Sequence, residues 1–216
     1  MLAMPSPSDS QSKLDNSIPT VQIVGNVLDK DGHPITGATI KFFAYAGSTG
    51  AMPRGLSNSV GYFSLRVPAL GAGLIRAMKI DSGYPDAGNT LYGRIGYESV
   101  KEISANADTP LIEVSLRFGD PDAVIDWTIR SEKDSSILKN ALYKIALVED
   151  PAGYSSGTIR TNGGFLFVLP KRPVVIVISA PGYMDWSTAD DPAFGRNFML
   201  KPGSRQKRDI YLKASQ

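Results

Sequence analysis

The sequence contains no cysteine and only one histidine, His33. Without cysteine the chain forms no disulfide, carries no thiolate nucleophile and offers no cysteine-based metal site. A catalytic triad or a zinc site needs histidine held among positioned partners, and His33 lies alone in the polar turn Asp31-Gly-His-Pro34. We therefore expect no catalytic residues, no bound metal and no cofactor, and we interpret His33 as an exposed turn residue.

Long apolar runs are also missing. The longest, Val174 to Ile178, has the length of a strand and falls far short of the roughly 20 residues of a membrane helix. Residues 1–17 have neither a basic start nor an apolar centre, so we do not expect a secretory signal there. Either a signal has been removed, or export uses another route, or the protein stays inside the cell; we favour an extracellular, cell-surface or exported assembly.

The charge is nearly balanced, with 23 basic and 21 acidic residues. A nucleic-acid-binding protein usually carries a concentrated basic face, so we expect no nucleic-acid partner. One local basic cluster lies near the C-terminus, at Lys201, Arg205, Lys207, Arg208 and Lys213. Basic side chains on an edge strand discourage sheet-to-sheet aggregation, and we favour that interpretation over an anionic partner.

The 21 glycines and 15 prolines indicate many tight turns, and the segments between them have strand character. Apolar residues alternate with period two and are rich in β-branched types. No run of ten or more residues combines helical periodicity with caps. The predicted strands lie around 21–27, 38–45, 61–68, 74–80 and 112–118, and then around 124–129, 138–148, 161–170, 174–179 and 208–212.

The second half of the chain repeats the first. The glycine, aromatic and proline of Gly61, Phe63 and Pro68 recur as Gly163, Phe165 and Pro170, and Gly83-Tyr84 recurs as Gly182-Tyr183. Because the same elements recur in the same order about 100 residues apart, we infer an internal duplication. We predict a flexible arm at 1–18 and two β-sandwiches at 19–120 and 121–216. The fold class is all-β, as two tandem antiparallel sandwiches with Greek-key-like connections.

The motifs of the first unit resemble a known family. IVGNVLDKDGHPITGATIKF, then SNSVGYFSLRVP, then a strand ending in Gly83-Tyr84, is similar to the carboxypeptidase regulatory-like domain. The second unit keeps GGFLFVLP and APGY but has Lys139-Asn140 where that family has glycine, so it resembles a diverged copy. The resemblance implies a transthyretin-like (prealbumin) sandwich that acts as an accessory or a spacer in bacterial surface and injection-machine proteins, and it implies no catalytic chemistry.

Two loops carry aromatic residues that could contact a ligand. Tyr92 and Tyr97 lie in the long loop 85–98, and Tyr183 and Trp186 follow the glycine of the second unit. Aromatic side chains in loops can stack on sugar rings or anchor a protein partner, although Trp186 could instead cap its own sandwich. We expect a structural protein that assembles with other protein subunits, including further copies of itself. The alternative is a module that binds a glycan or a protein through these aromatics.

Two acidic groups are candidates for a calcium site. Asp29 and Asp31 precede Gly32, but the twelfth position counted from Asp29 is Ile40, where a calcium loop has a bidentate glutamate. An Asp-Gly turn explains this group better. Asp185, Asp190 and Asp191 form the second group. The prediction for both groups is that no metal binds. Tyr84 and Tyr183 are predicted to plug one end of each sandwich, with the hydroxyl bonded to a backbone group.

Overall fold

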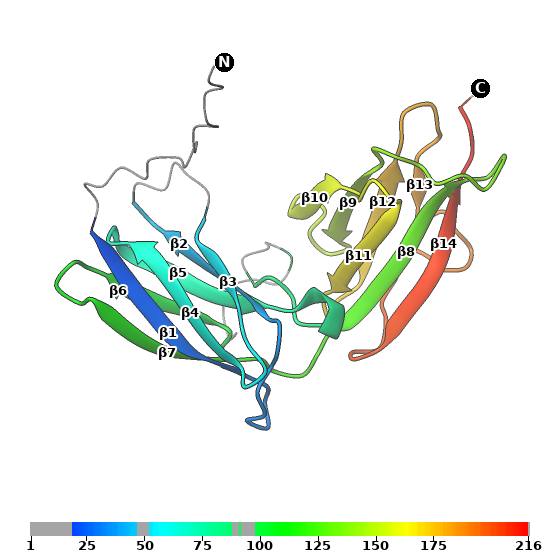
Figure 1. Cartoon of the computed structure of the whole chain (residues 1–216). Helices are drawn as coiled ribbons and strands as arrows, with labels where there is room; N and C mark the ends of the chain where they lie inside the picture. Colours follow the sequence, from blue (N-terminus) through cyan, green and yellow to red (C-terminus); the bar gives the residue numbers. More distant parts are fainter. Residues whose placement is uncertain (1–18, 47–51, 88–90, 92–97, 216) are drawn as a thin grey trace, which may run out of the picture.

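The computed structural model describes residues 19–46, 52–87, 91 and 98–215, which form four β-sheets (Figure 1). The four sheets make two β-sandwiches, because their buried residues fall into two separate apolar cores. The predicted all-β fold of two sandwiches in tandem is thereby confirmed.

The first sandwich pairs a three-stranded sheet with a four-stranded one. The order of the first is β4-β1-β7 and that of the second is β3-β2-β5-β6. Alternate residues of each strand point inward, so that the core contains Ile23, Phe42, Phe63 and Ile75. The strands are β1 (Thr20–Leu28), β2 (Thr39–Ala44), β3 (Arg54–Leu56), β4 (Tyr62–Pro68), β5 (Gly71–Met78), β6 (Val100–Ala105) and β7 (Leu111–Arg117).

The second sandwich repeats this plan. Its sheets have the orders β11-β8-β14 and β10-β9-β12-β13, so each strand occupies the place of the strand seven numbers earlier. The duplication inferred from sequence is therefore a duplication of topology. The strands are β8 (Ala123–Ser131), β9 (Leu142–Leu147), β10 (Tyr154–Thr158), β11 (Gly164–Leu169), β12 (Val174–Ser179), β13 (Trp186–Ser187) and β14 (Arg205–Leu212).

One strand in each sandwich departs from the antiparallel prediction. The closing strand β7 pairs parallel with β1, and β14 pairs parallel with β8, while every other pairing is antiparallel. A parallel pair needs a long connection that crosses from one sheet to the other. The chain returns to the three-stranded sheet between β6 and β7 in the first unit, and between β13 and β14 in the second.

Two glycines explain the tight turns before the buried aromatics. Gly61 has φ +74° and Gly163 has φ +72°, a region that favours glycine. A Cβ at Gly61 would lie 2.6 Å from the Val27 carbonyl oxygen, and one at Gly163 would lie 2.6 Å from Ile137 Cγ2. The nearly equal φ angles, and the same 2.6 Å distance from the added Cβ to its nearest atom, indicate that these glycines form the same kind of turn.

Four elements lie where no strand was predicted. These are β3, β6, β10 and β13, which all fall between the predicted strands. Each lies at the edge of its sheet, where a short strand needs little apolar alternation. The predicted strand 74–80 also ends early, because Ile80–Ser82 forms a 3-10 helix, η1.

Candidate functional site

The aromatic residues predicted as contacts divide into two groups. Tyr92 and Tyr97 lie outside the described residues. Tyr183 and Trp186 are partly buried and pack against the core of the second sandwich. Tyr84 packs against the core of the first sandwich and stacks on Phe118, with ring centroids 4.2 Å apart. The packing of Tyr84 and Tyr183 agrees with the prediction that they close their sandwiches; the hydrogen bonds of their hydroxyls stay predictions.

Trp186 belongs to an aromatic cluster around Trp127. Its ring meets Trp127 edge-on at 5.7 Å and Phe194 edge-on at 5.4 Å. Its indole Nε1 donates a hydrogen bond to Asp191 Oδ2 at 3.1 Å. Trp186 therefore covers one side of its own core, which is the second of the two roles expected from sequence.

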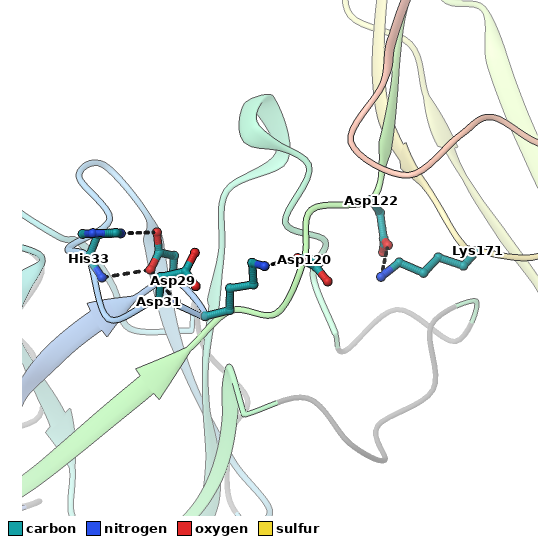
Figure 2. A network of polar contacts seen from close by, with 7 residues as sticks. Asp29, Asp31, His33, Asp120, Asp122 and Lys171 are labelled. Carbon is teal, nitrogen blue, oxygen red and sulfur yellow. Dashed lines mark hydrogen bonds and ion pairs between the residues drawn. The ribbon is translucent and has the colours of Figure 1, made fainter.

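The acidic turn at Asp29 is held by hydrogen bonds. Asp29 Oδ1 accepts from the backbone N–H of Asp31 at 2.9 Å and from that of His33 at 2.8 Å, while Oδ2 lies 3.2 Å from His33 Nδ1 (Figure 2). Slight burial raises the pKa of Asp29, but the bonds from His33 and Asp31 outweigh it and hold that pKa below its ordinary value. His33 is an exposed turn residue, as predicted.

The arrangement that the sequence did not reveal is the junction between the sandwiches. Val124 and Val168 pair across β8 and β11, and both are buried although neither belongs to either apolar core. The helix η1 of the first unit packs against these two strands. Arg205 of β14 also donates from Nη1 to the Asp81 carbonyl oxygen at 3.3 Å. The end of the first sandwich is thus seated on the outer face of a sheet of the second.

A second contact reaches into the core itself. Leu91 follows η1 by nine residues and is 1% exposed, and it belongs to the core of the second sandwich. Its carbonyl oxygen accepts a hydrogen bond from Arg172 Nη2 at 3.0 Å. A leucine of the first unit therefore completes the hydrophobic core of the second.

The connection between β7 and β8 is the third contact. Asp122 donates its backbone N–H to the Gly83 carbonyl oxygen at 2.8 Å. Its carboxylate is 4% exposed, and Oδ1 lies 3.3 Å from Lys171 Nζ (Figure 2). Burial raises the pKa of Asp122, and Lys171 partly opposes that effect. A neighbouring ion pair joins Lys30 to Asp120 at 3.2 Å.

These groups line a cleft of about 500 Å³ at the junction. Three cationic and three anionic side chains line it, so its charge is balanced: Lys30, Arg117, Lys171, Glu98, Asp120 and Asp122. Four of these six charges form two ion pairs within the chain, Lys30 with Asp120 and Lys171 with Asp122. The single histidine is not in the lining and lies in the Asp29 turn.

The basic cluster predicted near the C-terminus lies mostly on β14, which is an edge strand. Arg205 Nη2 pairs with Asp126 Oδ2 at 2.7 Å, and the Arg208 guanidinium lies 4.8 Å from the centre of the Phe194 ring. These two residues lie on a strand edge, as predicted, and their effect on aggregation stays a prediction. Among the residues described, none forms a helix suited to crossing a bilayer.

No protein-family model and no curated protein matches the sequence. Among solved structures, the shaft pilin SpaA of Lactobacillus rhamnosus GG is 13% identical, with 91% of this chain and 98% of that chain covered and a TM-score of 0.36. The TIE protein of Bacillus anthracis is 15% identical over 91% of this chain and 34% of that one, with a TM-score of 0.34. A streptococcal ancillary pilin is 13% identical over 93% and 63%, also at 0.34. TM-scores this low do not support an inference about function.

Proposed function

We propose that this chain is a non-catalytic structural subunit or spacer that assembles with other protein subunits in a surface, filament, virion or injection-system assembly. The observation that carries the proposal is the junction, where η1, Leu91 and Asp122 bind one sandwich to the other. A spacer has to hold its modules at a fixed separation, and three separate contacts do this better than a linker alone.

Several finer features belong to the same proposal. The domain limits are 19–120 and 121–216, each sandwich is of the carboxypeptidase regulatory-like, transthyretin-like kind, and the protein acts at the cell surface or in an exported assembly. The motif around Asp29 and Gly61 supports the family, since both residues form the turns for which the motif selects them. Residues 1–18 would order against the sheet edge of a neighbour.

The test compares the full chain with a variant that lacks residues 1–18. Light scattering coupled to size exclusion, followed by negative-stain microscopy of any large fraction, measures the assembly state. We expect a defined oligomer or fibre from the full chain, and its loss from the shortened variant while the β-sheet circular dichroism is unchanged. Monomers at every concentration for both proteins, with a mass of 23.2 kDa for the full chain, would contradict self-assembly.

One observation favours a second candidate, a glycan-binding module. A shallow cleft of about 320 Å³ lies beside Trp186, where Phe194 and Tyr211 add aromatic surface and Arg208 and Asp209 add polar groups. Aromatic faces beside charged groups suit a sugar ring. Because Trp186 is part of the core, the cleaner test is Tyr211→Ala on a glycan array, with Tyr154→Ala as the control. Binding that survives Tyr211→Ala, or no binding by the full chain, would contradict this candidate.

A further inference from the structure

The two four-stranded sheets differ on their outward faces. In the first sandwich, Lys41 of β2 and Arg76 of β5 lie opposite each other and point outward. Asp86 joins them, with Oδ1 3.1 Å from Arg76 Nε and Oδ2 3.4 Å from Lys41 Nζ. Pro85 and Ala87 on either side of it are buried. The segment that follows η1 therefore covers this face with one carboxylate between two small apolar residues.

The equivalent row of the second sandwich has no carboxylate paired across it among the described residues. Lys144 lies opposite Val177, and this pair occupies the place of Lys41 and Arg76. The two lysines correspond because each lies three residues after an alanine, Ala38 or Ala141, whose carbonyl oxygen accepts a backbone hydrogen bond. The segment after Gly182 pairs with the edge of β12 as β13 and contributes Ala189 and Arg196 to the border of this face. It leaves a groove of about 340 Å³ whose lining includes Ala146, Val148, Val175, Val177 and Ala189. We call these five residues the bare face.

Two cations border the bare face without an acidic partner. Lys144 and Arg196 line the groove, are exposed, and form no ion pair with any residue that the structure describes. Lys144 lies over the Tyr154 ring, 4.3 Å from its centre. An apolar groove bordered by two unpaired cations complements an apolar segment that carries a carboxylate.

From this internal template we propose that the bare face binds an extended segment of a partner protein subunit, with a carboxylate on Lys144 and Arg196 and small apolar side chains over Val175 and Val177. The occupant has the chemistry of Pro85-Asp86-Ala87, supplied from another molecule. The inference extends the proposed assembly role by naming one surface and the kind of segment that this surface accepts.

The probe is a blocked peptide with the sequence of residues 83–88, Gly-Tyr-Pro-Asp-Ala-Gly, titrated into the isotope-labelled full chain and followed by NMR. We expect saturable shifts at Lys144, Ala146 and Val177, and a peptide with Asp86→Asn to bind roughly two- to fivefold more weakly, the range for exposed ion pairs. The titration needs no oligomer, so its failure is distinct from failure of the assembly role.

Matched variants sharpen the result. Lys144→Ala should weaken the peptide by a similar factor, and Val177→Arg, which restores the Lys-Arg row of the first sandwich, should tighten it. Lys207→Ala, exposed on β14 of the other sheet, is the control and should leave binding unchanged. Shifts absent from the bare face, or equal affinity for the Asp and Asn peptides, would overturn the proposal.

Discussion

The two sandwiches share a topology but use the segment after their Gly-Tyr pair in different ways. After Gly83-Tyr84 the chain crosses its own sheet through Asp86 and then places Leu91 in the core of the next sandwich. After Gly182-Tyr183 it turns back, pairs as β13, adds Phe198 to its own core and packs Trp186 and Phe194 against that core. One segment connects two sandwiches and the other closes its own, so the same motif can serve as a joint or as a cap.

The outer faces of the two three-stranded sheets also differ. Val124 and Val168 pair beneath η1, and the pairing of the first sandwich places Gln22 and Arg66 at the corresponding positions. Arg66 is exposed there, whereas both valines are buried. A polar pair would leave charge and amide groups without water under a second η1. The outer face of the first sandwich therefore lacks the buried apolar pair on which η1 rests in the second.

The cores differ at one central position. Trp127 pairs with Phe165, and Gly25 occupies the same place opposite Phe63. A Cβ at Gly25 would lie 1.8 Å from the Val114 carbonyl oxygen, whereas Trp127 is fully buried and its ring lies near Phe165, Trp186, Phe194 and Phe198. The first sandwich brings its parallel strand close, and the second fills its interior with aromatic rings.

The largest effect should come from removing that aromatic centre. We expect Trp127→Ala to lower the free energy of unfolding by about 3–5 kcal/mol, because a large buried ring leaves a cavity. Urea denaturation measures the change, and hydrogen exchange by strand should place the loss in the second sandwich. Equal loss of protection in β1 and β4 would show that the two cores are not separate.

Leu91→Ala tests the joint. Although Leu91 is part of the first unit, we expect the variant to destabilise the second sandwich by about 2–4 kcal/mol, as for a buried leucine elsewhere. Hydrogen exchange in β11 and β12 should report it. Leu56→Ala, at a leucine that is 67% exposed, is the matched control and should change stability little. Loss of protection confined to the first sandwich would contradict the assigned contact.

Gly25→Ala should cause a smaller loss of stability, and this loss should be confined to the first sandwich. The added methyl group meets the backbone of β7, and overpacking of this kind costs about 1–3 kcal/mol. We expect weaker exchange protection in β1 and β7 and an unchanged tryptophan fluorescence spectrum, because both tryptophans lie in the second sandwich. An unaltered melting temperature would show that β7 moves away at little cost.

The smallest effect concerns the pH dependence of the junction. Burial raises the pKa of Asp122, so the folded state holds this proton more tightly than the unfolded state. Stability from this group is therefore greatest below the unfolded pKa and falls as pH rises through the folded pKa. We expect Asp122→Asn to remove that fall in stability. The difference in unfolding midpoint, variant minus native chain, should therefore increase from acidic to neutral pH.

The balancing ion pair provides the control for this prediction. Lys171→Met removes the cation 3.3 Å from Asp122, which should raise the carboxyl pKa further and steepen the fall in stability with pH. Parallel stability curves for the native chain and Asp122→Asn across the acidic range would contradict the assigned role of this carboxylate.

Local chemistry made much of the fold predictable. The turn at Asp29-Gly32, the glycines at 61 and 163 and the alternating strands around them are properties of short segments, and each appears in the structure where the sequence placed it. His33 was predictable for the same reason, since an Asp-Gly turn holds it at the surface. The edge strands β3, β6 and β10 were not, because pairing with a neighbour rather than their own pattern makes them strands.

The sequence by itself determined two β-sandwiches with matching turns, because alternation and glycine placement act over a few residues. It could not determine that Leu91 belongs to the core of the second sandwich, that Val124 and Val168 lie under η1, or that Trp127 takes the place of Gly25. Those facts depend on which surfaces meet after the strands have formed. Only the tertiary structure decides them, since an apolar residue looks the same in sequence whichever core it fills.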